Sequence, residues 1–140
     1  MTKRIKTLVA MIMTLVMCLS CFTVFASAAE TGVSPRLSHM AGGTFVFSAT
    51  ENGGEAYVSY DGYPDSFVSA KVTFQLQKRF LLVFWNDVAE WSATSTELCG
   101  YFYHEFELDG TGTYRLNMTL EVTGNDGTVD VITDSMEDKY

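Results

Sequence analysis

The sequence predicts an all-β protein, an antiparallel β-sandwich of about seven short strands behind an N-terminal signal-peptide helix. Two observations lead to this prediction. Apolar and polar residues alternate along most of the chain beyond residue 42, which is the pattern of strands with one buried face. Clusters of Gly, Asn and Asp at 51–55, 61–65, 108–113 and 124–127 interrupt the alternation where tight turns are needed.

The beginning of the chain has the composition of an export signal. Basic residues lie within the first six positions, an apolar run follows at 7–25, and Ala26 and Ala28 form the small-x-small pattern that signal peptidase accepts. We therefore interpret 1–29 as a cleaved signal peptide. An uncleaved anchor is one alternative, since about 20 apolar residues span a bilayer. A lipoprotein modified at Cys21 is another.

Beyond the signal, the sequence predicts an extended lead-in segment at 30–42 and a single β-sandwich domain at 43–140. The lead-in segment contains His39, and we expect it to be mobile. No internal repeat and no low-complexity tract divides the rest of the chain.

The chain from residue 30 onward is strongly acidic. It holds six Lys and Arg residues against seventeen Asp and Glu residues, a net charge of −11 with His neutral. Nucleic acid requires a basic face on its partner, and anionic lipid attracts proteins through Lys and Arg. We therefore expect a secreted, extracellular or cell-surface-associated protein with no nucleic-acid partner and no membrane contact after signal cleavage.

Cysteine usage leaves the sandwich without an internal disulfide. Two of the three cysteines lie in the signal, and Cys99 alone remains. The fold must then be stabilised by its core, which a domain of this size can supply. We interpret Cys99 as a small buried hydrophobic residue, with a free thiol as the alternative.

Alternation assigns an inward face to each predicted strand. The clearest case is 114–122, where the alternation is strict. His104 falls on a predicted inward face, which favours a hydrogen-bonded core residue over a ligand. The apolar residues predicted to face inward are Phe45, Phe47, Ala56, Val58, Tyr60, Ala70, Val72, Phe74, Leu76, Phe102, Phe106, Leu108, Tyr114, Leu116, Met118, Leu120, Val122, Val129 and Val131.

The segment GTGTYRL at 110–116 narrows the fold to an immunoglobulin-like sandwich. A Gly two residues before a Tyr that opens an inward-alternating strand is typical of the tyrosine corner, in which the hydroxyl binds the preceding crossover. Tyr114 is this tyrosine. Leu116 occupies the position that holds Cys in antibody domains, so the disulfide of those domains is absent.

Several short pieces of the chain match one family pattern. They are SPR at 34–36, LQK at 76–78, WNDVAEW at 85–91, GTYRL at 112–116, and the closing Ser135 and Tyr140. On these pieces the chain resembles a family of small Sec-exported β-sandwich proteins of Gram-positive bacteria, a domain family of unknown function. The resemblance implies the fold and export, and no reaction. The family usually has a polar turn where this chain has RFLLVF.

One stretch, QLQKRFLLVFWNDVAEW at 75–91, contains a long apolar run without Gly or Pro. Strands usually have about 3–10 residues, so the chain must reverse inside this stretch, and we place the bend at 78–82. Phe80, Leu81 and Leu82 are then expected at an exposed loop tip that acts as a contact site. The outgoing strand carries two Trp and one Val at a spacing of three, which fits neither a plain strand nor a single bulge.

Three tyrosines form a second candidate binding surface. Tyr101 and Tyr103 lie on the outward face of their predicted strand, and Tyr57 lies on the outward face of another. If the two faces adjoin, the row can stack on sugar rings or anchor a protein partner. The alternative is cross-strand aromatic pairing that only stiffens the sheet.

The sequence contains two candidate catalytic pairs, and neither favours catalysis. Cys99 and His104 are five residues apart, which puts them on opposite faces of one strand. Glu105 and Glu107 share a face at about 7 Å, within the range of an inverting glycosidase pair, but a solvated acidic face explains them better. We predict a non-enzyme without catalytic residues or cofactors.

Two predicted turns contain oxygen ligands that suit calcium. Asp61 and Asp65 lie at one turn, and Asp126 and Asp130 at another. Neither loop has the spacing of an EF-hand, and Asp is common in turns for conformational reasons. These four residues are weak calcium candidates, and no metal site is predicted.

Together these features predict an exported, non-catalytic binding module. It is expected to contact a cell-surface polymer or protein, such as a surface glycan, through exposed aromatics or the apolar loop tip. The alternatives are a structural or colonisation-related secreted protein without a small ligand, and a small hydrolase.

Overall fold

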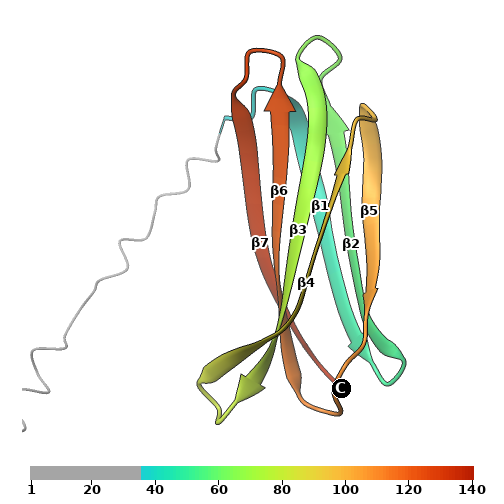
Figure 1. The fold of residues 1–140 in the computed structure, drawn as a ribbon, viewed down its shortest axis with the longest axis vertical. Coiled ribbons are helices and arrows are strands. Elements are labelled where there is room, and N and C mark those ends of the chain that lie inside the picture. Colours follow the sequence, from blue (N-terminus) through green and yellow to red (C-terminus); the bar gives the residue numbers. More distant parts are fainter. Residues whose placement is uncertain (1–35) are drawn as a thin grey trace, which may run out of the picture. The chain divides into compact units, whose positions relative to one another are not determined.

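A computed structural model describes residues 36–140, so the predicted signal peptide at 1–29 and the first part of the lead-in segment, 30–35, lie outside the described residues. Leu37–Tyr140 form one compact unit, in which Figure 1 shows the strands running up and down. The strands are β1 Met40–Thr50, β2 Gly53–Gly62, β3 Phe67–Phe80, β4 Phe84–Ser95, β5 Cys99–Phe106, β6 Thr113–Gly124 and β7 Val129–Lys139.

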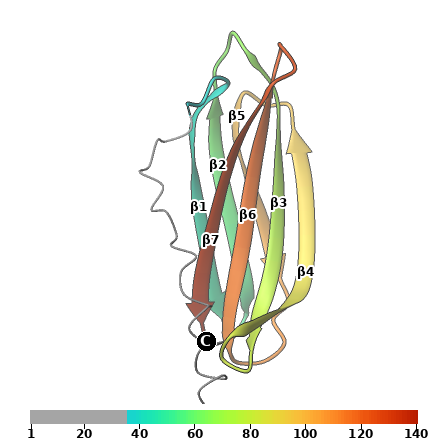
Figure 2. The ribbon, with the colours of Figure 1, turned by 90° about the vertical axis from the view of Figure 1, so that its left-hand side faces the viewer.

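The strands form two sheets that pack face to face. One sheet has the order β1-β2-β5 and the other has the order β4-β3-β6-β7. Every neighbouring pair is antiparallel, and Figure 2 shows the four-stranded sheet in front of the three-stranded one. The predicted all-β sandwich of seven strands is confirmed.

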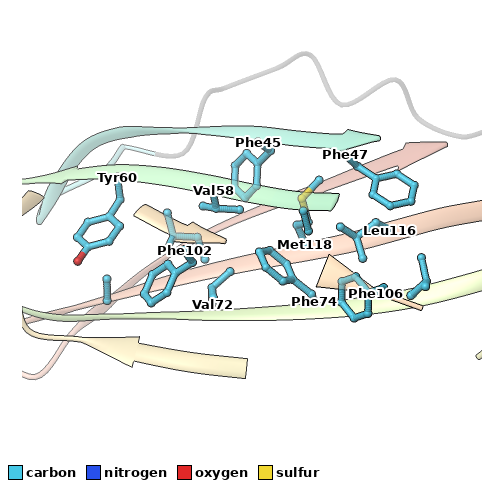
Figure 3. Close-up of a cluster of buried hydrophobic side chains, with 14 of the residues drawn as sticks. Phe45, Phe47, Val58, Tyr60, Val72, Phe74, Phe102, Phe106, Leu116 and Met118 are labelled. Atoms are coloured by element: carbon cyan, nitrogen blue, oxygen red, sulfur yellow. The ribbon is translucent and has the colours of Figure 1, made fainter. Parts of the chain in front are cut away.

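The core lies between the sheets and follows from the alternation in the sequence. Figure 3 shows aromatic rings and aliphatic chains from both sheets meeting there. Phe74 of β3 is fully buried and stacks on Trp91 of β4, with ring centroids 5.4 Å apart. The residues that were predicted inward and are buried are Phe45, Phe47, Ala56, Val58, Tyr60, Ala70, Val72, Phe74, Leu76, Phe102, Phe106, Tyr114, Leu116, Met118, Leu120 and Val122.

The inward face predicted for the last strand is wrong. Val129 and Val131 are exposed on the outer face of β7, and Ile132 packs against the core instead. Asp130 shares the parity of Ile132, and its carboxylate accepts hydrogen bonds from two backbone N–H groups of the lead-in segment, at 2.7 and 2.6 Å. Asp130 can therefore lie on the inward side of β7 because its carboxylate has hydrogen-bond donors there. A pattern that counts only apolar residues places it on the outer side.

Tyr114 forms the predicted tyrosine corner. Its side chain is fully buried, and its hydroxyl donates a hydrogen bond of 2.7 Å to the carbonyl of Gly110. Its ring stacks on that of Tyr140, with centroids 6.0 Å apart. These contacts fix the crossover from β5 to the start of β6, and they confirm the immunoglobulin-like feature of the fold.

The end of the lead-in segment is fixed to the sandwich, so the expected mobility of His39 is wrong. Its side chain is buried, and its Nε2 lies 2.6 Å from the hydroxyl of Thr128. The imidazole occupies the space that a Cβ on Gly124 would need. The backbone carbonyl of His39 also accepts a hydrogen bond of 2.9 Å from the N–H of Tyr63. The first strand begins directly after this residue, at Met40, rather than near residue 43.

Candidate functional site

The hairpin of β3 and β4 ends in a three-residue turn of apolar side chains. The last cross-strand pair is Phe80 with Phe84, and 81–83 form the turn. The predicted chain reversal inside 75–91 is confirmed. The predicted exposure of Phe80, Leu81 and Leu82 is confirmed as well. In chain order from Phe80 to Phe84 the side chains are 52%, 69%, 87%, 71% and 61% exposed. We call these five residues the apolar tip.

Two members of the apolar tip, Val83 and Phe84, were not in the predicted site. The same unbroken apolar run contains them, so the run itself was the signal. The predicted bend at 78–82 was too early because β3 continues to Phe80, where it still pairs with β4.

The apolar tip projects beyond the neighbouring strand. Pairing between β3 and β6 ends at Lys78 and Tyr114. From Arg79 onward, the hairpin residues pair only with each other across the hairpin, beginning with Arg79 and Trp85. Figure 1 shows this end of the hairpin turning away from the rest of the sandwich. The tip is therefore convex and has no sheet partner along its flanks.

The turn holds two leucines in left-handed backbone conformations. Leu81 has a φ of 47° and Leu82 a φ of 69°, and they are the only non-glycine residues with positive φ in the described part of the chain. Left-handed conformations cost about 1–2 kcal/mol per residue for side chains with a Cβ. Gly and Asn are the usual occupants of such turns, so these leucines are present despite the backbone geometry.

Two guanidinium groups lie against the indole of Trp85 at the base of the apolar tip. The guanidinium of Arg79 lies 4.8 Å from the ring centroid, and that of Arg115 lies 4.1 Å away. Arg115 also donates two hydrogen bonds to the side-chain oxygen of Gln77, at 3.0 and 2.6 Å. Arg115 comes from β6, so its place beside the tip could not be inferred from sequence spacing.

A single β-bulge lies between the two tryptophans of β4. The expectation that one bulge could not explain the spacing of Trp85, Val88 and Trp91 is therefore wrong. Leu76 pairs with Ala89 and Gln77 with Asp87, so Val88 is the extra residue. The bulge reverses the parity of the strand. Trp91 therefore faces inward, while the indole of Trp85 lies under Arg115 on the outer face.

The three candidate tyrosines adjoin on the outer face of the three-stranded sheet. Tyr57 pairs with Tyr103 in register, and the rings of Tyr57 and Tyr101 stack with centroids 5.6 Å apart. Tyr101 is 68% exposed and Tyr103 45%. The hydroxyl of Tyr103 donates a 2.8 Å hydrogen bond to Glu105, and this bond raises the pKa of Tyr103 to about 12.

The thiol of Cys99 is exposed, so its interpretation as a buried hydrophobic residue is wrong. Cys99 starts β5 at the sheet edge, where its Sγ lies 2.8 Å from a carboxylate oxygen of Asp61. The hydrogen bond to Asp61 raises the pKa of the Cys99 thiol. A thiol held in its protonated form is a poor nucleophile.

His104 lies between aromatic rings, away from the face that carries the tyrosines. Its imidazole stacks on Trp91 with centroids 4.4 Å apart and contacts the ring of Phe106 edge-on at 4.5 Å. Burial lowers the pKa of His104, which keeps the ring neutral near pH 7. The predicted inward orientation is confirmed, and aromatic stacking takes the place of the expected hydrogen bond.

Three of the four weak calcium candidates, Asp61, Asp126 and Asp130, have hydrogen-bond partners within the protein. Asp126 accepts from the backbone N–H and the hydroxyl of Thr128, at 2.9 and 2.7 Å, and these bonds lower its pKa. Asp130 binds backbone N–H groups of the lead-in segment, and Asp61 faces Cys99. Within residues 36–140, no three His, Cys, Asp or Glu side chains come together as metal ligands.

Comparison with known proteins gives no relative. No protein-family model matches the chain, and no curated protein or solved structure matches it significantly. Among the residues that the structure describes, no helix is long and apolar enough to cross a membrane. The functional interpretation therefore depends on the surface features of this chain.

Proposed function

We propose that the chain is an exported, non-catalytic interaction module that binds a component of the cell surface. The observation that carries this proposal is the apolar tip. Leaving a large apolar side chain in water rather than burying it forgoes about 1.5–3 kcal/mol, and five such residues are consecutive here. Scattered apolar residues on a surface need no explanation, but a contiguous projecting group supports a contact role.

The backbone of the tip supports the same proposal. Leu81 and Leu82 replace the glycine or asparagine that their φ values favour, so the turn is less stable than it could be. Strained non-glycine residues in a turn are typical of positions retained for contact rather than for stability. Export is supported by the basic, apolar and small-residue pattern of the first 29 residues.

The absence of catalysis is part of the proposal. The raised pKa of the Cys99 thiol and the stacking of His104 on Trp91 leave neither group prepared for nucleophilic or acid–base chemistry. Hydrolysis of ester, peptide or glycoside substrates that is lost on Cys99→Ser or Glu105→Gln would contradict this part of the proposal.

The proposal is tested by replacing Phe80–Leu82 with Ser-Gly-Ser in the chain that starts at residue 30. All seven strands and the core lie within Leu37–Tyr140, so this form retains the whole fold. We expect an unfolding midpoint no lower than that of the original chain, because the variant also removes the left-handed leucines, and a loss of sedimentation with isolated bacterial cell envelopes. Undiminished sedimentation of the variant would reject the apolar tip as the contact site.

The adjoining tyrosines favour glycan binding as a second candidate function. Tyr57, Tyr101 and Tyr103 present stacked, partly exposed rings on a sheet face, and such rings can stack on sugars. Screening the protein and its Tyr101→Ala variant on a glycan array tests this function. Retention of a glycan signal by the variant would assign the rings to sheet stiffening.

A further inference from the structure

We propose that the apolar tip inserts into the surface of a lipid bilayer. This inference rests on the proposed function and names the partner of the same site. It departs from the expectation, based on net charge, that the exported chain has no membrane contact. The local arrangement of residues 79–85 supports it through length, side-chain order, backbone pairing and charge.

The length of the apolar tip matches the depth of the bilayer interface. Leu82 lies three residues beyond Arg79, which corresponds to at most about 10 Å at roughly 3.3 Å per strand residue. Interfacial elements bury their apolar side chains about 5–10 Å into the boundary between headgroups and acyl chains. The tip is therefore long enough to reach the acyl chains and too short to span them.

The order of side chains along the hairpin follows the polarity of that interface. Moving from the turn toward the sandwich, the cross-strand pair next to the apolar tip is Arg79 with Trp85. The guanidinium of Arg115 lies over the same indole. Tryptophan is enriched where headgroups meet acyl chains, and arginine binds phosphate oxygens through several N–H groups. With the tip inserted, the indole and both guanidinium groups would lie at headgroup depth.

The backbone of the tip limits the cost of leaving water. Phe80 pairs with Phe84 across the hairpin, and the N–H of Val83 lies 2.9 Å from the carbonyl of Leu81. Unpaired backbone groups are costly in hydrocarbon. A short, internally paired turn exposes few of them, and a shallow insertion leaves the rest of the hairpin in water.

The charges near the tip indicate insertion rather than electrostatic adhesion. Arg79 forms a 2.7 Å ion pair with Glu137, and Lys78 donates to the carbonyl of Asp109. The chain as a whole is acidic, so long-range attraction to anionic lipid is weak or repulsive. Binding that depends on apolar insertion should survive high salt, which screens charges beyond about 3 Å at roughly 1 M.

A protein partner and a second copy fit the tip less well. A standard protein interface covers about 800 Å² on each partner, and a convex turn of five residues presents less than a flat face would. Interfaces also carry about one hydrogen bond per 100–200 Å², and none of the five side chains contains a donor or an acceptor. Self-association of tips would bring strongly acidic molecules together.

The test uses the chain from residue 30 onward, which omits the apolar N-terminal run that would itself bind lipid. The probe is vesicles of phosphatidylethanolamine and phosphatidylglycerol. The chain has two tryptophans, so a Trp91→Phe variant leaves Trp85 as the sole reporter beside the tip. We expect co-sedimentation that persists at high salt and a shift of Trp85 emission to shorter wavelengths. In a Trp85→Phe variant the emission of Trp91 should stay unchanged.

Two variants with equal charge connect the effect to the tip. Leu82→Asp places a carboxylate at the most exposed position of the tip, and Val131→Asp places the same charge on an exposed valine of β7. We expect Leu82→Asp to lower the vesicle partition coefficient by about tenfold or more, since burial of one large apolar side chain contributes at least that factor. Val131→Asp should have a much smaller effect.

A third variant separates binding from folding. Leu81→Asn combined with Leu82→Gly matches the left-handed backbone of the turn, so it should fold at least as well as the original chain. We expect it to lose vesicle binding, together with the Trp85 shift when Trp91→Phe is also present. Loss of binding in a variant of undiminished stability cannot be attributed to unfolding.

The remaining outcomes overturn the bilayer proposal in distinguishable ways. Binding that disappears at high salt and is insensitive to Leu82→Asp would indicate adhesion through charge. A concentration-dependent dimer, abolished by Leu82→Asp and formed without vesicle binding, would indicate tip-to-tip association. Envelope binding that requires the tip, without vesicle binding, would keep the proposed function and assign its partner to a protein or a polymer. If substitutions in the apolar tip reduce neither vesicle binding nor envelope binding, the bilayer proposal and the proposed function are both rejected.

Discussion

Within residues 36–140, Leu81 and Leu82 are the two side-chain-bearing residues whose backbone conformation is usually left to glycine. Their φ values of 47° and 69° lie in the left-handed region, which glycine enters freely and branched aliphatic residues avoid. Both side chains are also exposed, so burial does not offset this cost. The turn should therefore be a place where substitution stabilises the protein.

Replacing Leu81 with Asn and Leu82 with Gly is expected to raise the free energy of unfolding by about 1–2 kcal/mol, because the left-handed strain is relieved. Thermal denaturation measures the change. Val83→Ser is the matched control, since it removes a neighbouring exposed side chain without addressing a positive φ, and it should shift the midpoint little. A lower midpoint for the double variant would show that the leucines stabilise the turn.

The phenol of Tyr103 should make the stability of the protein depend on alkaline pH. Its pKa is raised to about 12 by the hydrogen bond to Glu105, above the value of about 10 for an unfolded chain. A raised pKa means that the protonated phenol stabilises the fold below pH about 10. That contribution is lost as the pH rises through about 12.

In Glu105→Gln the charge of the acceptor is gone, so the pKa of Tyr103 should fall toward about 10. The measurement is a titration of phenolate absorbance, compared with Glu107→Gln, which changes a nearby carboxyl that is not bonded to Tyr103. Identical titration curves for the wild type and Glu105→Gln would refute the assigned cause.

At the level of single residues, exposure of the tip could be predicted because a strand has a limited length. The exposure of Cys99 could not be predicted, because cysteine is usually a buried apolar residue. In the structure its thiol donates a hydrogen bond to the carboxylate of Asp61 at an exposed sheet edge. His39 was misjudged for a related reason. Its partner Thr128 is distant in sequence, and no local pattern marks such a contact.

At the scale of the element, the start of β6 depends on one hydroxyl. Tyr114 is fully buried and donates to the carbonyl of Gly110, which closes the β5–β6 crossover. We expect Tyr114→Phe to lower the free energy of unfolding by about 1 kcal/mol, the usual net contribution of such a hydrogen bond. Urea unfolding measures it, with Tyr101→Phe as the exposed control. Equal effects of the two substitutions would count against the corner.

The strands themselves show which elements a sequence pattern can define. β6 was predictable because a central strand has apolar neighbours on one face only, and its alternation is unbroken from Tyr114 to Val122. β4 was not predictable in detail, because the bulge at Val88 reverses its parity between the two tryptophans. The pattern of β7 misled because Asp130 occupies an inward position with its hydrogen bonds satisfied.

At the scale of the whole molecule, Phe74 links the two sheets. It is fully buried in β3, stacks on Trp91 of the same sheet and meets Phe106 of the opposite sheet edge-on at 6.4 Å. Phe74→Ala is expected to lower the free energy of unfolding by about 3–5 kcal/mol through lost burial and the cavity that remains. Val131→Ala, on the outer face, should change it by about 0.5 kcal/mol or less.

Chemical denaturation of both variants, monitored by circular dichroism, provides the comparison for Phe74. A cost for Phe74→Ala as small as that of the surface control would mean that the sheets are held together elsewhere. A cost of the expected size would confirm that this aromatic cluster determines stability in a chain whose described residues form no disulfide.

The class of fold was predictable from alternation and turns, whereas the assignment of strands to sheets was not. β4 joins the sheet of β3, β6 and β7, and β5 joins the sheet of β1 and β2. The short turn after β4 leads into an opposite layer, and nothing in its composition indicates this change. The contact between Arg115 of β6 and Trp85 of β4 depends on that assignment, so the base of the candidate site could be found only in three dimensions.

The backbone pairing of Tyr140 with Gly112 has a practical consequence for handling the protein. Tyr140 and Gly112 exchange N–H···O bonds of 3.0 and 3.3 Å, and Gly112 lies against the side chain of Lys78 in the hairpin. Figures 1 and 2 both place this end of the chain beside the hairpin, and the start of β1 at the far end of the sandwich. An affinity tag added after Tyr140 would therefore crowd the surface under test. A tag ahead of Arg36 would leave that surface free and orient an immobilised molecule with its leucines outward.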